Sequence, residues 1–419
     1  MDQIVRAAAD EGEFSGSVLV ARGAQVLLDQ GYGLANREWE IANDGDTRFR
    51  LASVSKQFTA VAALLLSERG RLDLDAPIRT YLPDAPATWD AVTTRLLLTH
   101  GSGIPDFTRD ADYGALKVRP TTPAELIARV RDRPLAFRPG EGWAYSNSGY
   151  VVATAVIEAA SGERYADFVQ ANLFAPLGMA DSGYDSHAAI VPHRAAGYVP
   201  TREGVVNADY VDMSVPQGAG GLYSTTRDLL KWEEGLFGGR LLKPASLAAL
   251  TTPYRDDYAL GLVVRTEDGD AVVSHSGGIE GFNTYLGRDL DAGLTVVVLG
   301  NLNGAAPEKL GRDLMTLARG GTVTLARERR TVTLSAQALE DYVGVYALAS
   351  GLTLTLSVAD GRLTAQATGQ PAVELFPEVA DAFFLTAVDA QITFDRDAAG
   401  AITGLVLHQG GRDMPAARQ

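Results

Sequence analysis

The sequence predicts two domains: an α/β domain with an antiparallel sheet and an all-helical part, followed by a smaller all-β domain. Strand patterns stand at both ends of the first 320 residues, and a helical block separates them. After Gly320 and Gly321 the chain changes to short strands with turns about every 8–12 residues, a spacing typical of sandwiches and barrels. The length of 419 residues also exceeds what one hydrophobic core usually holds. We expect an α/β domain over 1–320, a linker over 321–332 and a β domain over 333–419.

The N-terminal elements follow from the spacing of apolar side chains. Residues 1–12 have the pattern of a short amphipathic helix. Residues 16–36, GSVLVARGAQVLLDQGYGLAN, alternate apolar and polar side chains around Arg22-Gly23-Ala24, which predicts a β-hairpin. Residues 53–69 then form an apolar helix that ends near Gly70.

The middle of the chain, about 85–215, is predicted to be a helical subdomain interrupted by glycine and proline. Its clearest helices are TPAELIARVRDR and SGYVVATAVIEAASG, the second closed by Gly162. Strands return in DYALGLVVRTED, DAVVSHSGG, GFNTYLGRD and GLTVVVLGN. Short turns join these strands, so we expect an antiparallel sheet, with PEKLGRDLMTLARGG as the closing helix.

The last part of the chain begins with the charged segment TLARERRT, which we interpret as the linker. The strands that follow are LTLTLSV, RLTAQAT, AVELFPE, AFFLTAV, AQITFDRD and ITGLVLHQ. In the first of them, one face is formed by Leu352, Leu354, Leu356 and Val358. This pattern predicts a small β-barrel.

Composition excludes several classes of function. A net charge of -15 without a basic stripe argues against nucleic acid as a partner. The absence of cysteine excludes disulfides, thiolate zinc sites and a cysteine nucleophile. The absence of a Gly-x-Ser-x-Gly elbow argues against a classical lipase-type hydrolase. There is no dinucleotide or phosphate-loop fingerprint and no His-Glu-x-x-His, so we expect neither cofactor nor metal. The histidines are scattered over His100, His187, His193, His275 and His408.

The N-terminal residues and the apolar runs bear on location. The longest apolar runs, such as TAVAALLL, are shorter than the ~20 residues that cross a bilayer, so we expect no membrane span. The first residues, MDQIVRAAADEGEFSGS, lack the basic and apolar regions of a signal peptide. A cytoplasmic protein is expected from the sequence as written, and a periplasmic or secreted one if a signal has been removed.

Ser53 and Lys56 begin the helix at 53–69, and residues three apart share a helix face. Burial lowers the pKa of a lysine, which can then act as a general base toward a neighbouring hydroxyl. The free N–H of Ser53 at the helix start can donate to an oxyanion. The alternative is that Ser53 only caps the helix and Lys56 is solvated. The helix dipole and the apolar flanks, FRLAS and QFTAVAALLL, disfavour a solvated lysine there.

Two further stretches contain candidate site residues. WAYSNSGY places Tyr145 and Asn147 in a polar loop before a helix, where a phenol can relay a proton and an amide can hold a substrate. VVSHSGGIEGF places His275 at the end of an apolar strand, and the glycines after it let a substrate backbone lie against that strand. The alternatives are a tyrosine packed in a turn and a surface histidine beside a hairpin.

Taken together, Ser53-Val54-Ser55-Lys56, Tyr145-Ser146-Asn147 and His275-Ser276-Gly277 resemble the motifs of the penicillin-recognising serine hydrolases. That superfamily includes class C β-lactamases, D-Ala-D-Ala carboxypeptidases, D-aminopeptidases and β-lactamase-like carboxylesterases. Four further stretches are similar to the same family: LLLTHGSGIPDF, FRPGEGWAYSNSGY, LFAPLGMADSGY and GAGGLYSTTRDLLKW. The resemblance covers about residues 10–320. It implies a β-lactamase/transpeptidase-like sheet flanked by helices.

The resemblance also implies a role for each candidate residue. Ser53 attacks a carbonyl and forms an acyl-enzyme, and Lys56 and Tyr145 transfer protons, with the choice of base left open. Asn147 contacts the substrate amide or orients Lys56. His275 belongs to the catalytic set. The strand after it binds substrate through Ser276 and Gly277, and Gly278 is the second oxyanion donor beside the N–H of Ser53.

One departure from the family pattern narrows the activity. β-Lactamases and carboxypeptidases usually have lysine where this chain has His275, a residue that titrates near neutrality. We therefore expect a D-aminopeptidase-like peptidase or a carboxylesterase acting on amide or ester bonds. A β-lactamase or D-Ala-D-Ala carboxypeptidase is the first alternative, and a sensor that is acylated without turnover is the second.

The same resemblance bears on the partners and on the last domain. A small molecule or a short peptide is the expected substrate. Residues 333–419 are similar to the lipocalin-like domain appended to some peptidases of this branch. Such domains border the active site or mediate oligomers, so a homo-oligomer stays open.

Overall fold

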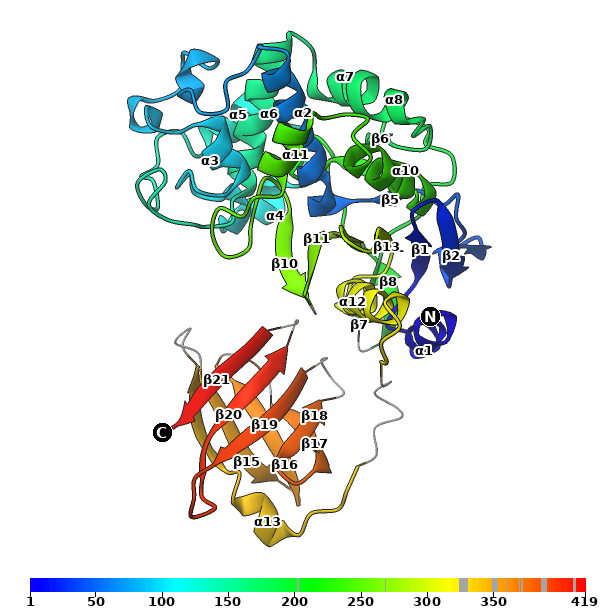
Figure 1. The fold of residues 1–419 in the computed structure, drawn as a ribbon, viewed down its shortest axis with the longest axis vertical. Helices are drawn as coiled ribbons and strands as arrows, with labels where there is room; N and C mark the ends of the chain where they lie inside the picture. The colour runs from blue at the N-terminus through cyan, green and yellow to red at the C-terminus, as the bar shows by residue number, and fades with distance from the viewer. Residues whose placement is uncertain are drawn as a thin grey trace. The chain divides into compact units, whose positions relative to one another are not determined.

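A computed structural model describes residues 1–419 except 202, 268, 324–330, 349–352, 360, 369, 371, 386–389 and 410–411. The chain forms two compact units, Met1–Gly321 and Thr322–Gln419, each with its own core (Figure 1). Most of the segment TLARERRT lies outside the described residues. Each unit is described by itself below.

The centre of the first unit is an antiparallel sheet. In the part of the chain that the structure describes, its six strands run in the order β10-β11-β12-β13-β1-β2. Their bounds are β1 Gly16–Arg22, β2 Gln25–Tyr32, β10 Val263–Glu267, β11 Asp270–Ile279, β12 Phe282–Asp289 and β13 Leu294–Gly300. The N-terminal hairpin joins the C-terminal meander where β1 pairs with β13, for example Val18 with Val298. Every residue of β13 is buried, because helices cover both faces of the sheet.

Helices on opposite faces of the sheet explain this burial. On one face lie α1, Asp2–Asp10, and α12, Ala306–Ala318 (Figure 1). These are the amphipathic helix predicted at 1–12 and the predicted closing helix. On the other face lie α10, Thr226–Phe237, and the helical part with α2, Ser55–Glu68. Residues 55–66 of α2 are all buried, so this helix is the centre of the core rather than a surface element.

The predicted helix at 53–69 differs at its start. Residues Ala52–Val54 form a 3₁₀ turn, η1, and the α-helix begins only at Ser55. The helix expected in TPAELIARVRDR is also shorter, because α5 ends at Ala128. By contrast, α6, Asn147–Ser161, ends as predicted at Gly162, whose φ of 77° is the left-handed conformation that glycine adopts readily.

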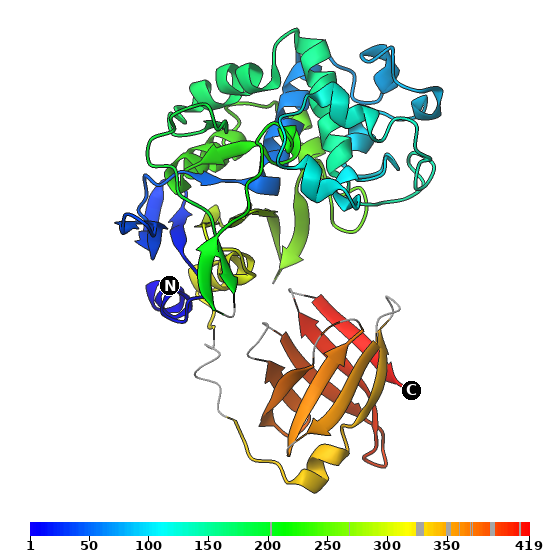
Figure 2. The same cartoon turned by 180° about the vertical axis from the view of Figure 1, so that it is seen from behind.

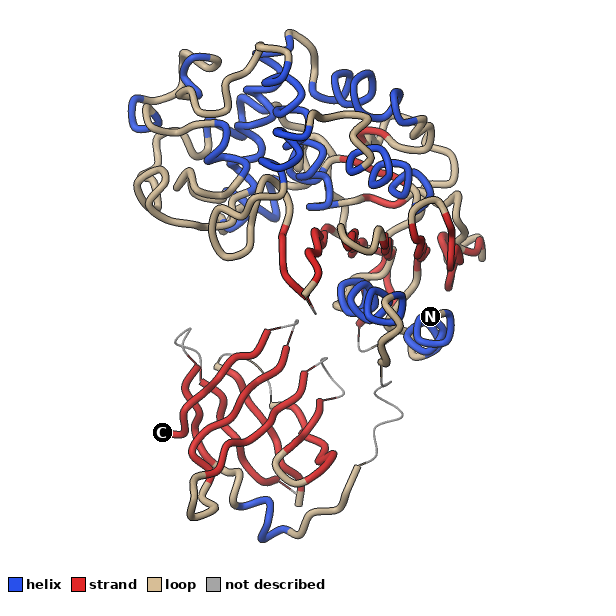
Figure 3. The backbone as a smooth tube through the Cα atoms, viewed as in Figure 1, coloured by secondary structure: helices blue, strands red, loops and turns tan. Residues whose placement is uncertain are grey.

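The helical part also contains short strands that the sequence analysis did not name. The hairpin β7–β8 is visible from behind in Figure 2, and Figure 3 shows helices and strands by colour. The remaining helical elements of this unit are η2 Ile78–Thr80, η3 Ala87–Trp89, α3 Thr94–Leu98, η4 Phe107–Arg109, α4 Tyr113–Leu116, α5 Pro123–Ala128, α7 Tyr165–Val169, η5 Gln170–Phe174, α8 Ala175–Leu177, α9 Gln217–Gly220 and α11 Pro244–Leu250. The remaining strands are β3 Leu34–Asn36, β4 Ile41–Ala42, β5 Phe49–Arg50, β6 Gly183–Tyr184, β7 Tyr198–Thr201, β8 Gly204–Asn207 and β9 Leu222–Ser224.

The second unit is a closed barrel, as the strand pattern predicted. Among its described residues eight strands follow one another in chain order, and β14 pairs with β21 to close it. The elements are α13 Ala336–Glu340, β14 Gly344–Leu348, β15 Thr353–Ala359, β16 Arg362–Ala367, β17 Val373–Val379, β18 Ala382–Leu385, β19 Ala390–Arg396, β20 Ile402–Gln409 and β21 Arg412–Arg418.

The barrel core confirms most of the face predicted for its second strand. Leu354 and Leu356 are buried, and Val358 packs against the same cluster, while Leu352 lies outside the described residues. The sequence analysis missed β14 and β21. The second of these, RDMPAAR, carries a proline and little apolar alternation, which demotes it as a strand pattern.

Candidate active site

The turn that carries Ser53 is held in an uncommon backbone conformation. Ala52, immediately before it, has a φ of 48°, which costs energy for a residue with a Cβ. Strand β11 packs tightly against this turn, since a Cβ on Gly277 would lie 2.4 Å from the Leu51 carbonyl oxygen. Thr284 on β12 donates a hydrogen bond of 2.8 Å to the same carbonyl. The sheet therefore fixes the position of Ser53 through its neighbours.

Lys56 lies one turn further along the chain and is completely buried. Its Nζ is 2.9 Å from Ser53 Oγ, 2.9 Å from Asn147 Oδ1 and 2.8 Å from the Ala219 carbonyl oxygen. Burial lowers the pKa of Lys56 to about 7, although the nearby Asp106 carboxylate opposes the shift. A neutral amine has two N–H groups and one lone pair. Asn147 and Ala219 can accept the two hydrogens, which leaves the lone pair for the Ser53 hydroxyl.

Tyr145 approaches the same hydroxyl from the loop before α6. Its Oη lies 2.9 Å from Ser53 Oγ. Burial raises the pKa of Tyr145, so its phenol is protonated at neutral pH. His100 packs against its ring with centroids 4.2 Å apart, and the Ser146 N–H donates to His100 Nδ1 over 3.1 Å. This packing orients the phenol.

Asn147 is oriented by a buried acidic residue. Its Nδ2 donates to Asp106 Oδ2 over 3.1 Å and to Thr108 Oγ1 over 3.3 Å. Both partners are acceptors here, so the amide nitrogen faces them and Oδ1 must face Lys56. Asp106 thus sets which atom of Asn147 meets the lysine.

His275 lies behind Tyr145 rather than in the open cavity. Strand β11 continues past it to Ile279, so the expectation that His275 ends the strand is wrong. The expectation that it titrates near neutrality is also wrong, because burial, with a further effect of Lys56, lowers the pKa of His275 to about 3. Its Nδ1 donates to the Ser276 carbonyl oxygen over 2.5 Å, and the Tyr258 hydroxyl lies 3.0 Å from Nε2. His275 is therefore a neutral group at physiological pH.

The next three residues after His275 on β11 differ in burial. Ser276 is partly buried, Gly277 is buried against Leu51, and Gly278 is exposed. In the register of the sheet, Gly278 is opposite Asn283 of β12. The structure thus brings Ser53, Lys56, Tyr145 and Asn147 into direct contact and places Gly278 beside them at a cavity wall.

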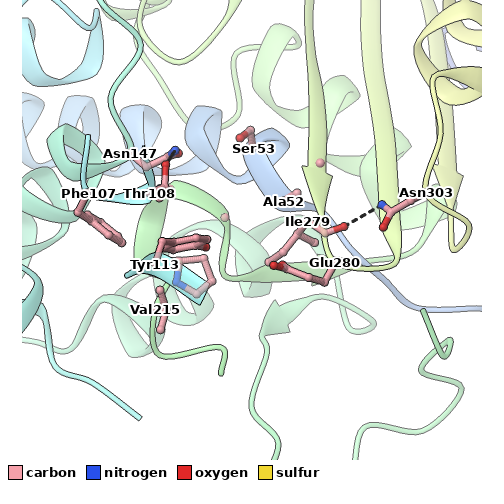
Figure 4. Close-up of a pocket in the computed structure, with 14 residues that line it drawn as sticks. Ala52, Ser53, Phe107, Thr108, Tyr113, Asn147, Val215, Ile279, Glu280 and Asn303 are labelled. Carbon is pink, nitrogen blue, oxygen red and sulfur yellow. Dashed lines mark hydrogen bonds between the residues drawn. The ribbon is translucent and has the colours of Figure 1, made fainter. Parts of the chain in front are cut away.

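A cavity of about 500 Å³ opens on Ser53 (Figure 4). Figure 4 shows Asn147 and Thr108 at one side of it and Glu280 and Tyr113 on the side away from Ser53. Burial, and next to it the Glu280 carboxylate, raises the pKa of Tyr113 to about 12. The residues that line the cavity are Ala52, Ser53, Phe107, Thr108, Tyr113, Asn147, Val215, Pro216, Ala219, Gly220, Gly278, Ile279, Glu280 and Asn303.

Sequence reasoning did not single out four contributors: His100, Asp106, Ala219 and Glu280. Asp106 and His100 lie within LLLTHGSGIPDF, and Ala219 lies within GAGGLYSTTRDLLKW. Both stretches are similar to the family, but nothing in their spacing shows that Ala219 contacts Lys56 or that Asp106 contacts Asn147. Glu280 follows the glycines of VVSHSGGIEGF and becomes a cavity residue only through the β11–β12 turn.

The described residues form neither a candidate metal centre nor a helix that could span a membrane. No three side chains of histidine, aspartate or glutamate in the described ranges gather closely enough to hold a metal ion. None of the helices described has the length and apolar character needed to cross a bilayer.

Family models match both units. The model described as beta-lactamase matches residues 1–320, and a domain of unknown function, DUF3471, matches residues 328–417.

Individual proteins are similar to the chain as well. Penicillin-binding protein 4* of Bacillus subtilis is 30% identical over 439 residues, which cover 98% of this chain and 96% of that protein. Esterase EstB of Burkholderia gladioli is 32% identical over 63% of this chain and 76% of its own. The crystal structure of D-amino acid amidase from Ochrobactrum anthropi superposes with a TM-score of 0.65 at 26% identity, covering 76% of this chain and 97% of that one.

Proposed function

The chain belongs to the beta-lactamase family of serine hydrolases, and from this premise we propose that Ser53 attacks amide bonds of small D-amino-acid amides and short peptides. The observation that carries the proposal is the contact of Ser53 Oγ with both Lys56 Nζ and Tyr145 Oη at 2.9 Å. One of these partners is a base with a pKa of about 7, and the other is a protonated phenol.

The two partners suit successive proton transfers. Neutral Lys56 takes the Ser53 proton as Oγ bonds to the substrate carbonyl carbon, and the amine becomes an ammonium. The Tyr145 phenol then protonates the leaving nitrogen as the C–N bond breaks, and the Lys56 ammonium restores the phenol. Water attacks the ester of Ser53 by the same transfers in reverse, releasing the acid. Lys56 is thus the base of our proposal, because Tyr145 holds its proton at neutral pH.

The developing oxyanion needs two donors that are already in place. We assign this role to the backbone N–H groups of Ser53 and Gly278, which both line the cavity. The packing of Gly277 against Leu51 supports the assignment, because it holds β11 against the nucleophile turn. Ser276 and Gly277 keep the strand extended for the substrate backbone.

Charge around the cavity supports a substrate with a free amine. Glu280 lines it, and Asp106 is buried beside Asn147. Lys117 donates to Glu280 over 2.8 Å and also pairs with Asp209 at 3.2 Å, so one cation faces two carboxylates. The site thus carries an excess of negative charge that favours an ammonium group. His275 is neutral and offers no fixed charge for a substrate carboxylate beside Ser53.

Ester hydrolysis is the second candidate. The similarity to esterase EstB favours it, and an ester leaving group needs less help from Tyr145 than an amine does. We propose that small esters are accepted by the same residues at higher KM, because they cannot use Glu280.

The test is turnover of D-alanine p-nitroanilide, p-nitrophenyl butyrate and nitrocefin by the wild type, Ser53→Ala and Ser67→Ala. Ser67 lies at the far end of α2 and serves as the matched control. We expect cleavage of the anilide and the ester, no turnover of nitrocefin, and a loss of at least about 10³-fold only in Ser53→Ala. Activity of Ser53→Ala within a few-fold of the wild type would refute the nucleophile.

A second comparison tests the amine. Glu280→Gln is expected to raise KM for the anilide about tenfold and to leave KM for the butyrate ester unchanged. An equal effect on both substrates would assign Glu280 a structural role only.

A further inference from the structure

A second cavity of about 280 Å³ adjoins the catalytic one, and the two share Glu280 as a wall. Arg50, Arg194 and His187 are among the residues that line it. Arg50 ends strand β5, three residues before Ser53, so one short segment of chain contributes to both cavities.

The arginines of this cavity share one counter-charge. Arg50 Nε donates to one oxygen of Asp185 over 2.8 Å, and Arg194 Nη1 donates to the other over 2.8 Å. Both carboxylate oxygens of Asp185 are thus already paired with an arginine, and the side chain is fully buried. Two guanidinium groups and one carboxylate leave a net charge of +1 at this end of the cavity.

The next polar group does not supply a second acceptor. His187 Nε2 lies 2.8 Å from the Val211 carbonyl oxygen and 3.3 Å from Arg50 Nη2. A ring nitrogen that donates to a carbonyl cannot also accept from an arginine. The shorter contact requires an N–H on Nε2, so Arg50 Nη2 has no acceptor there, although nine-tenths of Arg50 is buried.

Each of the two arginines has a further terminal nitrogen without an acceptor. Among the described residues, neither Arg50 Nη1 nor Arg194 Nη2 has a hydrogen-bond acceptor. Neither atom belongs to the fully buried atoms without a partner, so both keep contact with solvent, and both residues line the cavity. A planar guanidinium with free N–H groups matches a carboxylate in geometry and charge.

The walls define where such an anion would lie. Phe282 packs on Arg50, with the guanidinium carbon 5.6 Å from the ring centroid, which holds that side chain in place. Glu280 and Asp209 also line the cavity, and both are paired with Lys117. The unpaired N–H groups of the two arginines are therefore the groups of this lining that suit a carboxylate.

We propose that the cavity of Arg50 and Arg194, which has Glu280 in common with the catalytic cavity, is a subsite for a carboxylate of the substrate. The inference rests on the proposed function and deepens it, because it selects short peptides with a free C-terminus over simple amides. His275 is neutral and provides no positive charge for the substrate carboxylate. Arg50 and Arg194 provide that charge in our proposal.

The experiment compares peptides that differ only in their C-terminal group. D-Ala-Gly, D-Ala-Gly-Gly and D-Ala-Gly-Gly-Gly are each used as the free acid and as the C-terminal amide. The enzymes are wild type, Arg194→Gln, Arg194→Lys and Arg227→Gln. Arg227 is the matched control, since it pairs with two carboxylates, Asp29 and Asp46, outside both cavities. Release of D-alanine gives kcat and KM, and calorimetry on Ser53→Ala gives binding without turnover.

At one peptide length we expect the free acid to have a KM and a Kd about tenfold lower than its amide. Arg194→Gln should abolish this difference, Arg194→Lys should retain part of it, and Arg227→Gln should leave it unchanged. Equal binding of acid and amide at every length would overturn the subsite. Because the calorimetry needs no catalysis, it decides the subsite even if Ser53 proves not to be the nucleophile.

One further arm separates the substrate's carboxylate from a free acid. Succinate is titrated into Ser53→Ala and into Ser53→Ala with Arg194→Gln. Weak succinate binding, at least about tenfold weaker than the matching peptide acid, supports a substrate subsite. Succinate that binds as tightly as the peptide would overturn that assignment and identify a site for a separate small acid.

Discussion

Asp106 never touches Ser53, yet it determines the surroundings of Lys56 by accepting from Asn147 Nδ2 over 3.1 Å. Asn147 Oδ1 must then face the lysine at 2.9 Å. The same carboxylate raises the pKa of Lys56, while burial lowers it more strongly. Charge, burial and orientation of one amide together set a base that is neutral near physiological pH.

The first prediction concerns the pH dependence of kcat/KM. The pKa of Lys56 is lowered to about 7, and only its neutral form can accept the Ser53 proton. We therefore expect kcat/KM to rise with pH as for the loss of a single proton. The midpoint should lie near pH 7, and the curve should level off above about pH 8. Stopped-flow acylation by p-nitrophenyl acetate measures it. A rate independent of pH between 5 and 9 would exclude Lys56 as the base.

Asp106→Asn tests the coupling between the carboxylate and the lysine. Removing the negative charge should lower the pKa of Lys56 further, so the midpoint of the pH–rate profile moves to lower pH. The plateau rate should fall about 10–100-fold, because a neutral amide accepts from Asn147 Nδ2 more weakly than a carboxylate does and orients it less firmly. Both quantities come from one pH series. A midpoint that moves to higher pH would contradict the assigned effect of Asp106.

Gly277→Ala should damage the nucleophile turn without altering any reacting group. The new Cβ would lie 2.4 Å from both the Leu51 carbonyl oxygen and Thr284 Oγ1, so β11 and the turn must separate. We expect a loss of about 10²-fold in kcat/KM. Gly114→Ala is the control, because nothing lies within 4 Å of its Cβ position. Full activity of Gly277→Ala, with unchanged circular dichroism, would show that the close packing is dispensable.

Glu233 predicts a pH dependence of stability that is separate from catalysis. This residue of α10 is 2% exposed, its Oε2 has no partner among the described residues, and burial raises its pKa to about 8. Because the folded state holds this proton more tightly than the unfolded state, the contribution is fully present below about pH 4.5 and is lost as pH rises to about 8. Glu233→Gln should be more stable than the wild type at pH 8 by about 2 kcal/mol or more. Urea unfolding at pH 6 and 8 measures the difference, and an equal effect at both pH values would contradict it.

Local patterns were enough to predict the sheet, the main helices and the barrel. The β1–β2 hairpin, the alternation in β15 and the glycine stop of α6 depend on neighbouring residues only, and the structure confirms them. The alternation expected in β1 is not reflected in its burial, because residues 16–21 are all buried. The start of α2 was not predictable in the same way. The 3₁₀ turn at Ala52–Val54 depends on β11 packing against Leu51, a contact between residues more than two hundred positions apart.

The site shows the same division between local and distant information. Ser53 and Lys56 are one turn apart, so their contact follows from helix geometry. The neutral state of His275 does not, because its burial and its contact with Tyr258 come from the tertiary fold. The Ala219 carbonyl also reaches Lys56, and Asp106 reaches Asn147, only after the helical part folds around α2.

The most direct test of the account is to locate the serine that a phosphonylating reagent labels. Wild type and Lys56→Met are treated with a fluorophosphonate at pH 8 and digested. In the wild type, trypsin releases Leu51–Lys56, LASVSK, which contains both Ser53 and the buried Ser55. Fragmentation of this peptide distinguishes the two serines. We predict a single adduct on Ser53 in the wild type and labelling at least about 10²-fold slower in Lys56→Met. An adduct on Ser55 or on any other residue, or equal labelling of both proteins, would contradict Ser53 as a nucleophile activated by Lys56.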